Sequence, residues 1–265
     1  MKKLLTLTCL LILSSCAKEI PSEQLVKRQG VFYEINTTTP FTGSSVSYHK
    51  NGQLQSKENY KDGNLDGLRE IFYENGQLQT KENWKDGIED GSWEVYFENG
   101  QITGRGYYKD GKQDGFWESY YENGELEFKG NYKDGEKDGL WEEYYKNGEF
   151  KSKKGNYKDG KEDGLWELHR HDSGFLSYIY TRQNYKDGKV NGLIEHYYLN
   201  GQLHVKGNIN DKGLDGLFEY YDEDGQLESR YNFKDGEKDG LWEEYYKNGQ
   251  LKSKENYKDG ILINE

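Results

Sequence analysis

Aromatic and polar residues alternate along the chain in short runs, and each run ends at a turn signal. In one such run, Trp117, Ser119 and Tyr121 alternate with Glu118 and Tyr120. A period of two over six to eight residues is typical of a β-strand with one buried face. Asn-Gly closes these runs at one end and Asp-Gly at the other, and both dipeptides favour tight turns. The pattern therefore predicts a succession of β-hairpins.

The hairpin pattern is an internal repeat. Its unit reads Lys-Asp-Gly-x-x-Asp-Gly-Leu-Trp-Glu-x-Tyr-Tyr-x-Asn-Gly-Gln-Leu-x-x-Lys-x-Asn-Tyr. The first Asp of the unit recurs at Asp62, Asp86, Asp110, Asp134, Asp159, Asp187, Asp211, Asp235 and Asp259. Successive gaps are 24 residues, apart from one of 25 and one of 28. A fixed period of this length indicates an array, here about nine 24-residue hairpins over residues 41–265.

The charges predict how the strands pair. If Asn123-Gly124 forms a two-residue type I′ turn, with positive φ at both residues, the strand register follows from it. This register pairs Glu118 with Lys129, Trp117 with Gly130, Ser119 with Phe128, and Tyr121 with Leu126. It also places opposite charges across the other hairpins, as in Glu70 with Lys81. Such pairs stabilise a hairpin and specify its register.

The same register sorts side chains onto two faces of the predicted sheet. We call one the core face; it carries Trp117, Ser119, Tyr121, Leu126, Phe128, Gly130 and Tyr132. We call the other the ladder face; it carries Phe116, Glu118, Tyr120, Glu125, Glu127, Lys129 and Asn131. On the core face we expect the rings of Trp93 and Trp117 to lie over Gly106 and Gly130. Strand twist would curl this all-β antiparallel meander into an open sheet or a solenoid.

The repeat units resemble MORN repeats, and more closely the bacterial MORN-variant repeat, as in Asp-Gly-Leu-Trp-Glu-Glu-Tyr-Tyr-Lys-Asn-Gly at residues 138–148. The resemblance implies a MORN-like hairpin fold, a non-enzymatic binding or scaffolding role, and an antitoxin-like component of a toxin-antitoxin system. MORN repeats also occur in phosphatidylinositol-phosphate kinases. The chain has no nucleotide-binding Gly-rich loop with a following Lys, no His-Arg-Asp and no Asp-Phe-Gly, so a kinase label would be wrong.

The N-terminus predicts a lipid anchor. Lys2 and Lys3 precede an apolar stretch at residues 4–13, which is the pattern of a secretory signal helix rather than of a transmembrane helix. Leu13-Ser14-Ser15-Cys16 resembles the bacterial lipobox. We expect residues 1–15 to be a signal peptide, Cys16 to carry fatty acids such as palmitate, and residues 16–40 to form a tether and lead-in strand. The predicted location is the cell envelope, at the outer membrane or cell surface.

Composition limits the partners. The 36 basic and 48 acidic residues give a net charge of -12, which disfavours nucleic acid and anionic headgroups. Membrane attachment is then expected through the anchor only. The 15% of aromatic residues supply the apolar area that a chain with 32% charged residues otherwise lacks.

Candidate chemistry is sparse. In the irregular unit at residues 163–187, His169 and His171 share a strand face and Asp172 follows them. A third ligand on that face is missing, because strand alternation places His196 on the other face. The segment at residues 62–67 resembles the start of a calcium loop, but Tyr73 stands where a bidentate Glu is needed. No nucleophile stands beside a base. We therefore expect no metal site, no cofactor and no enzymatic activity.

A row of aromatic residues on the ladder face is the predicted binding surface. This tyrosine row consists of Tyr96, Tyr120, Tyr144, His169, Tyr197, Tyr221 and Tyr245. Exposed tyrosines provide contact area at low entropic cost, so the row favours an unidentified protein partner. Two alternatives remain: a cell-wall or glycan ligand, and rings that only shield the sheet. The apolar edge at residues 261–263 further predicts a homodimer.

Overall fold

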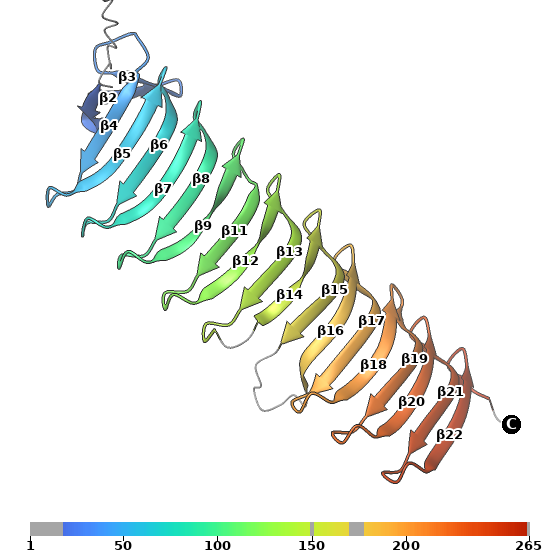
Figure 1. Cartoon of the computed structure of the whole chain (residues 1–265). Helices are drawn as coiled ribbons and strands as arrows, with labels where there is room; N and C mark the ends of the chain where they lie inside the picture. Colours follow the sequence, from blue (N-terminus) through green and yellow to red (C-terminus); the bar gives the residue numbers. More distant parts are fainter. Residues whose placement is uncertain (1–17, 149–150, 170–177, 264–265) are drawn as a thin grey trace, which may run out of the picture. The chain divides into compact units, whose positions relative to one another are not determined.

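The computed structural model describes residues 18–148, 151–169 and 178–263 (Figure 1). The chain divides into two compact units, residues 1–89 and 90–265. In both units the described residues form β-strands joined by short turns, and the one helical segment among them is the three-residue η1 (Ser22–Gln24). The predicted signal peptide and Cys16 lie outside the described residues.

The first unit begins with a small cap on the array. Strand β1 (Glu19–Pro21) pairs in parallel with β4 (Gly43–Tyr48), and β2 (Leu25–Arg28) forms a separate hairpin with β3 (Val31–Glu34). Ile20, Phe41 and Tyr60 form a buried cluster, on which part of the cap packs. A repeat array exposes apolar surface at its end unless something covers it, and this cap covers the first repeat.

Antiparallel pairing then follows chain order. In the first unit, β4 leads to β5 (Leu54–Lys61), β6 (Asn64–Phe72) and β7 (Leu78–Lys85). The second unit contains most of β8 (Ile88–Tyr96) and then β9 (Ile102–Lys109), β10 (Lys112–Gln113), β11 (Gly115–Tyr120), β12 (Leu126–Lys133), β13 (Glu136–Tyr144), β14 (Lys151–Lys158), β15 (Lys161–His169), β16 (Tyr178–Lys186), β17 (Lys189–Tyr198), β18 (Leu203–Asn210), β19 (Gly213–Tyr221), β20 (Leu227–Lys234), β21 (Glu237–Tyr245), β22 (Leu251–Lys258) and β23 (Ile261–Leu262). The predicted all-β antiparallel hairpin array is confirmed.

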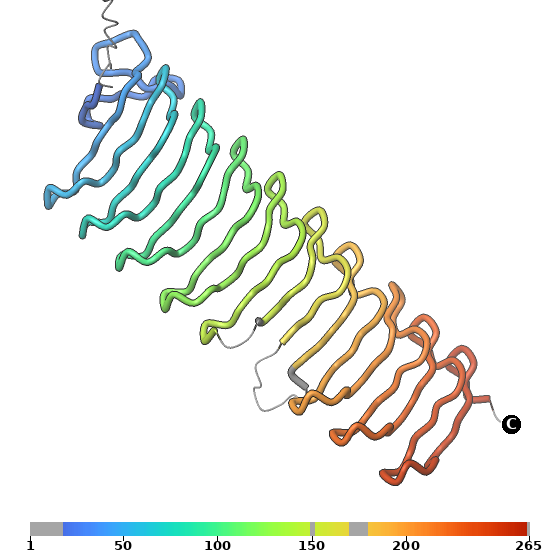
Figure 2. The backbone as a smooth tube through the Cα atoms, in the orientation of Figure 1, coloured from blue at the N-terminus to red at the C-terminus, as the bar shows by residue number. Residues whose placement is uncertain are grey.

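Turns join the strands at both ends of the hairpins (Figure 2), and the two-residue turn lies at the opposite end from the one that the sequence predicts. Asn123 does not have positive φ; instead the Gly124 N–H donates to the Tyr121 carbonyl and Gly124 alone is left-handed, at φ 85°. This is a type I turn followed by a bulge, and it shifts the register so that Tyr120, not Tyr121, pairs with Leu126. The two-residue turn with positive φ at both positions is Asp-Gly, as in Asp62 (φ 48°) and Gly63 (φ 78°). Away from the bulges the predicted pairs are confirmed, including Glu118 with Lys129.

The core face carries the residues that the sequence predicts, but its tryptophan rings cover the glycines of the preceding repeat rather than those of their own hairpin. Trp117 and Trp141 are 4% and 2% exposed. The Trp117 ring covers Gly106, in the preceding repeat, whereas the prediction placed it over Gly130 in its own hairpin. Gly130 is covered by Trp141. Trp117 and Trp141 therefore each pack their own repeat against the one before it. Each of these rings has a glycine opposite it on both flanking strands, and it covers the glycine of the preceding repeat.

An ion pair replaces this packing in the first unit. Arg69 takes the tryptophan position, and Glu58 and Glu82 take the flanking glycine positions. The Arg69 guanidinium contacts Glu58 at 3.1 Å and Glu82 at 2.9 Å. Here the tryptophan position carries no ring, and both flanking glycine positions carry a glutamate.

Hydrogen bonds at both ends of the hairpins also join one repeat to the next. The Tyr121 hydroxyl donates to the Tyr144 carbonyl at 2.8 Å, and the Asn123 amide donates to the Lys146 carbonyl at 2.7 Å. At the Asp-Gly end of the hairpins, the backbone N–H of Asp110 donates to the Asp90 carboxylate at 3.3 Å. The recurring Tyr, Asn and Asp therefore stabilise the stacking of hairpins, which explains their 24-residue period.

Candidate binding face

The tyrosine row lies on the ladder face as predicted, but its rings are half-buried rather than exposed. Most of its hydroxyls donate to the glutamate two residues earlier on the same strand. Tyr96 donates to Glu94 at 2.6 Å and Tyr120 to Glu118 at 2.7 Å. The bonds of Tyr144, Tyr197 and Tyr245 to Glu142, Glu195 and Glu243 measure 2.9, 3.0 and 3.0 Å. Burial raises the pKa of Tyr96 to about 12, and the Glu94 carboxylate adds to the shift, so this phenol is a neutral donor.

The glutamates of the ladder are shared between repeats. Glu142 contacts Lys129 of the preceding repeat at 3.0 Å and its own hairpin partner Lys154 at 3.7 Å. Glu195 contacts Arg182 at 3.2 Å and Lys206 at 3.9 Å in the same way. These contacts extend the charge ladder beyond the single hairpins that the sequence predicted.

The electrostatics at Glu243 favour its ionised carboxylate. The hydrogen bond from Arg230 is the main cause of the lowered pKa of Glu243, whose side chain is only 7% exposed. A buried carboxylate that keeps its charge needs such partners. Glu243 is thus paired within the fold and offers little free charge to a ligand.

The ladder face also carries a column of exposed apolar side chains, whose exposure the sequence did not predict. Phe116 is 50% exposed and Leu140 is 46% exposed. The same position of the repeat is filled by Leu165, Leu217 and Leu241, which are 36, 40 and 37% exposed. We call these five side chains the leucine column. Each precedes the core-face aromatic residue by one position, so strand alternation alone could have placed it on the ladder face.

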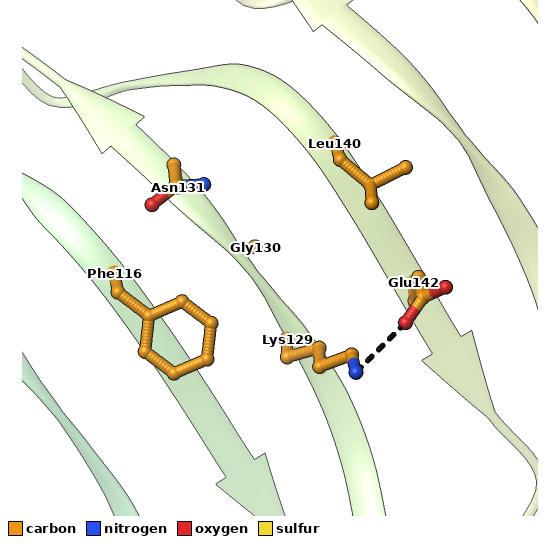
Figure 3. A pocket seen from close by; sticks show the side chains of 6 residues that line it. All are labelled: Phe116, Lys129, Gly130, Asn131, Leu140 and Glu142. Carbon is orange, nitrogen blue, oxygen red and sulfur yellow. Dashed lines mark ion pairs between the residues drawn. The ribbon is translucent and has the colours of Figure 1, made fainter.

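A shallow pocket of about 440 Å³ lies within this column (Figure 3). Phe116 from β11 and Leu140 from β13 flank it, and Asn131 from β12 lies between them. The ion pair of Lys129 with Glu142 closes one end. Apolar walls with a few polar groups are typical of surfaces that bind another molecule.

The core face offers less to a partner. Lys137 lies 3.9 Å from the centre of the Trp141 ring, and Lys238 lies 3.8 Å from that of Trp242. Burial lowers the pKa of Lys137, as expected for an ammonium packed on rings. Trp141 is thus covered from both sides, by Lys137 on one and by the backbone of Gly130 on the other.

The candidate metal ligands do not converge. His169 pairs with Tyr180 and His196 with Thr181, one position further, so the two histidines point to opposite faces. His171 and Asp172 lie outside the described residues. The Asp66 carboxylate accepts the Asp86 N–H at 3.2 Å. Within residues 18–148, 151–169 and 178–263, no group of three His, Cys, Asp or Glu side chains could hold a metal ion.

The fold and its repeating contacts define a repeat protein built from β-hairpins. Comparison with protein families then identifies it: the MORN repeat variant family matches residues 41–62, 65–86, 89–110, 113–134, 137–159, 190–211, 214–235 and 238–259. The chain belongs to this family, whose repeats indicate a protein-interaction module. The eight matched repeats omit the irregular unit.

Other comparisons add little. A comparison with curated proteins finds no match. A solved structure of the Photorhabdus luminescens Tc holotoxin pore is similar at 12% identity with a TM-score of 0.24, over 83% of this chain and 14% of that chain. Solved complexes named TcdB2-TccC3-Cdc42 and TcdB2-TccC3 are each similar at 13% identity with a TM-score of 0.21, over 85% of this chain. The chain spans about 14% of the length of these matched chains.

For the membrane, the described part of the chain contains no helix with the length and hydropathy needed to cross a bilayer.

Proposed function

We propose that this protein is a lipid-anchored, non-enzymatic repeat protein that binds a protein partner through the ladder face of its second unit. Cys16 carries the anchor and holds the array at the cell envelope. The leucine column and the half-buried tyrosine row together form the binding surface.

The uneven exposure of the two faces supports this proposal. Phe116 and Leu140 keep about half of their surface in water, although both lie within strands. On the core face, Trp141 and Trp166 are 2% and 0% exposed. Apolar side chains that stay exposed at the same position of several repeats favour a protein-protein interface.

The family resemblance adds an antitoxin-like role, in which the partner would be a toxin protein. An envelope anchor favours a partner at the envelope instead, because a lipoprotein does not reach a toxin in the cytoplasm. A glycan ligand is less favoured, since the tryptophans that stack on sugars in glycan-binding repeats are buried here on the core face.

Affinity capture with surface variants tests the proposal. The full chain is captured in detergent from the source cells, as wild type, as Phe116→Gln with Leu140→Gln, and as the control Ile88→Gln. Ile88 is 50% exposed but lies outside the leucine column. We expect one stoichiometric protein that is retained by the wild type and the control and lost from the double variant. Retention of wall fragments alone, or equal retention by all three chains, would contradict the proposal.

A further inference from the structure

A second pocket lies where the array departs from its period. It has a volume of about 430 Å³ and opens on the ladder face between β15, β16 and β17. Its lining includes Glu167, His169, Tyr180, Arg182, Tyr197 and Leu199. The volume is that of a site for one large side chain rather than for a macromolecular surface.

Three aromatic rings form one wall of this pocket. The ring centres of His169 and Tyr180 are 4.7 Å apart, and those of Tyr180 and Tyr197 are 5.1 Å apart. Tyr180 stands two residues before the ladder cation Arg182, a position filled by Thr103 and Glu127 in regular repeats. Among the regular repeats His204 is the other ring at this position, and it packs on Tyr198, so the wall of three rings is a feature of the irregular unit.

The rings are neutral at physiological pH. Burial lowers the pKa of His169, which keeps its imidazole uncharged. Burial also raises the pKa of Tyr180 to about 12, with the Glu167 carboxylate adding to the shift. Neutral aromatic rings present an electron-rich face, to which cations are attracted.

The carboxylate of the pocket is less neutralised than that of Glu142, which has the same place in the ladder. The Glu167 side chain is 37% exposed, whereas that of Glu142 is 6% exposed and contacts two lysines. Among the described residues, Arg182 is the one cation within 4.0 Å of Glu167, and it also contacts Glu195 at the shorter distance of 3.2 Å. Glu167 therefore retains capacity for a further cation.

We propose that this pocket binds an arginine side chain of the protein partner. A planar guanidinium can stack on the ring wall and also donate two hydrogen bonds to the carboxylate of Glu167. The net charge of -12 attracts a basic partner over longer range. That the arginine belongs to a protein rests on the proposed function; the preference of the pocket for a guanidinium does not.

Titration with small probes tests the pocket without the partner. N-acetyl-arginine amide and its uncharged isostere N-acetyl-citrulline amide are titrated into the full chain in detergent, with the tyrosine rings followed by NMR. We expect the arginine probe to shift the Tyr180 and Tyr197 ring signals with a Kd of about 1 mM. Citrulline should bind about tenfold more weakly.

Variants assign the effect to its residues. Glu167→Gln removes the charge at constant shape, and Tyr180→Thr installs the residue type of a regular repeat; each should weaken the arginine probe about tenfold. Glu219→Gln, the same change at the same ladder position in a regular repeat, should leave the Kd unchanged. Equal binding of citrulline, an unchanged Kd in Glu167→Gln, or shifts spread over the whole tyrosine row would overturn the proposal.

The two proposals fail separately. If the probe binds as expected but no protein is captured, the pocket stands and the protein partner does not. If a protein is captured through the leucine column but the arginine probe does not bind, the protein partner stands and the arginine-binding pocket does not.

Discussion

The packing of tryptophan on glycine can be tested by adding a single methyl group. Gly130 does not have positive φ, so alanine fits its backbone. A Cβ atom at this position would lie 1.9 Å from Cε3 of Trp141. The ring must move by about 1.5 Å to restore a 3.4 Å contact. Lys137 on its outer face and Phe128, stacked at 5.1 Å, oppose that movement.

The expected cost of Gly130→Ala follows from these contacts. Overpacking a core costs about 1–3 kcal/mol, and loss of a buried tryptophan costs about 3–5 kcal/mol. We expect a destabilisation of about 2–4 kcal/mol, since the ring is displaced only in part. For a unit of this size the Tm should fall by about 5–12 °C. Circular dichroism melts of the full chain measure it.

A double-mutant cycle attributes the loss to the ring. Ile194 fills the tryptophan position of another repeat opposite Gly207, so Trp141→Ile is the matched background. In that background Gly130→Ala should cost less than about 1 kcal/mol, because the obstructing ring is absent. A cost of Gly130→Ala below about 0.5 kcal/mol with Trp141 present would refute the reasoning.

Four further predictions cover pH, lipidation, assembly and metals. Burial lowers the folded-state pKa of His169 and His204 below 6.5. The stability that these neutral histidines contribute is therefore complete above pH 6.5 and is lost as the pH falls through the lowered pKa values. The double variant His169→Gln with His204→Gln should flatten the fall in Tm between pH 8 and 5. Carboxylates with a lowered pKa, such as Glu243, should lower the stability in a separate range, as the pH falls below 4.5. Cys16→Ser should move the protein from the membrane to the soluble fraction on cell fractionation, and persistence at the membrane would contradict the lipid anchor. Ile261 is 73% exposed in the edge strand β23, so light scattering should detect a homodimer that Ile261→Lys dissociates; a monomer at high concentration would reject it. Calcium or zinc at millimolar concentration should leave the Tm unchanged, and a rise would reveal a missed site.

The strand register could be predicted because the sequence contains a check on it. Glu118 and Lys129 face each other only if the strands pair as they do, and the repeat poses the same test in every hairpin. The faces then follow from alternation alone. Trp117 and Glu118 occupy the sides assigned to them.

The turn types could not be predicted from their dipeptides. Asn-Gly and Asp-Gly both tolerate a left-handed backbone, so either could form the two-residue turn. The choice depends on the length of the paired strands: Lys61 pairs directly with Asn64 around Asp62-Gly63, whereas a bulge at Tyr120 lengthens the other turn by one residue. Bulges arise from the pairing of whole strands and leave little trace in a dipeptide.

The candidate site was predicted in part. Alternation placed the tyrosine row on the ladder face, but it could not show that Tyr120 is held by the carboxylate of Glu118. Phe116 was placed on the same face and was overlooked because apolar residues are expected to be buried. The ring cluster of His169 with Tyr180 depends on the pairing of β15 with β16, one on each side of the irregular segment in the sequence, where the repeat no longer specifies the register.

Site-specific crosslinking in living cells tests the ladder face most directly. Benzoylphenylalanine replaces Phe116, Leu140 or Leu217 on the ladder face, or Ile35 or Tyr246 away from it, in the full lipid-anchored chain. A partner bound to the ladder face should give one discrete protein adduct from each of the first three positions and none from the last two. Adducts from Ile35 and Tyr246 alone, or none from the leucine column, would contradict the proposed function.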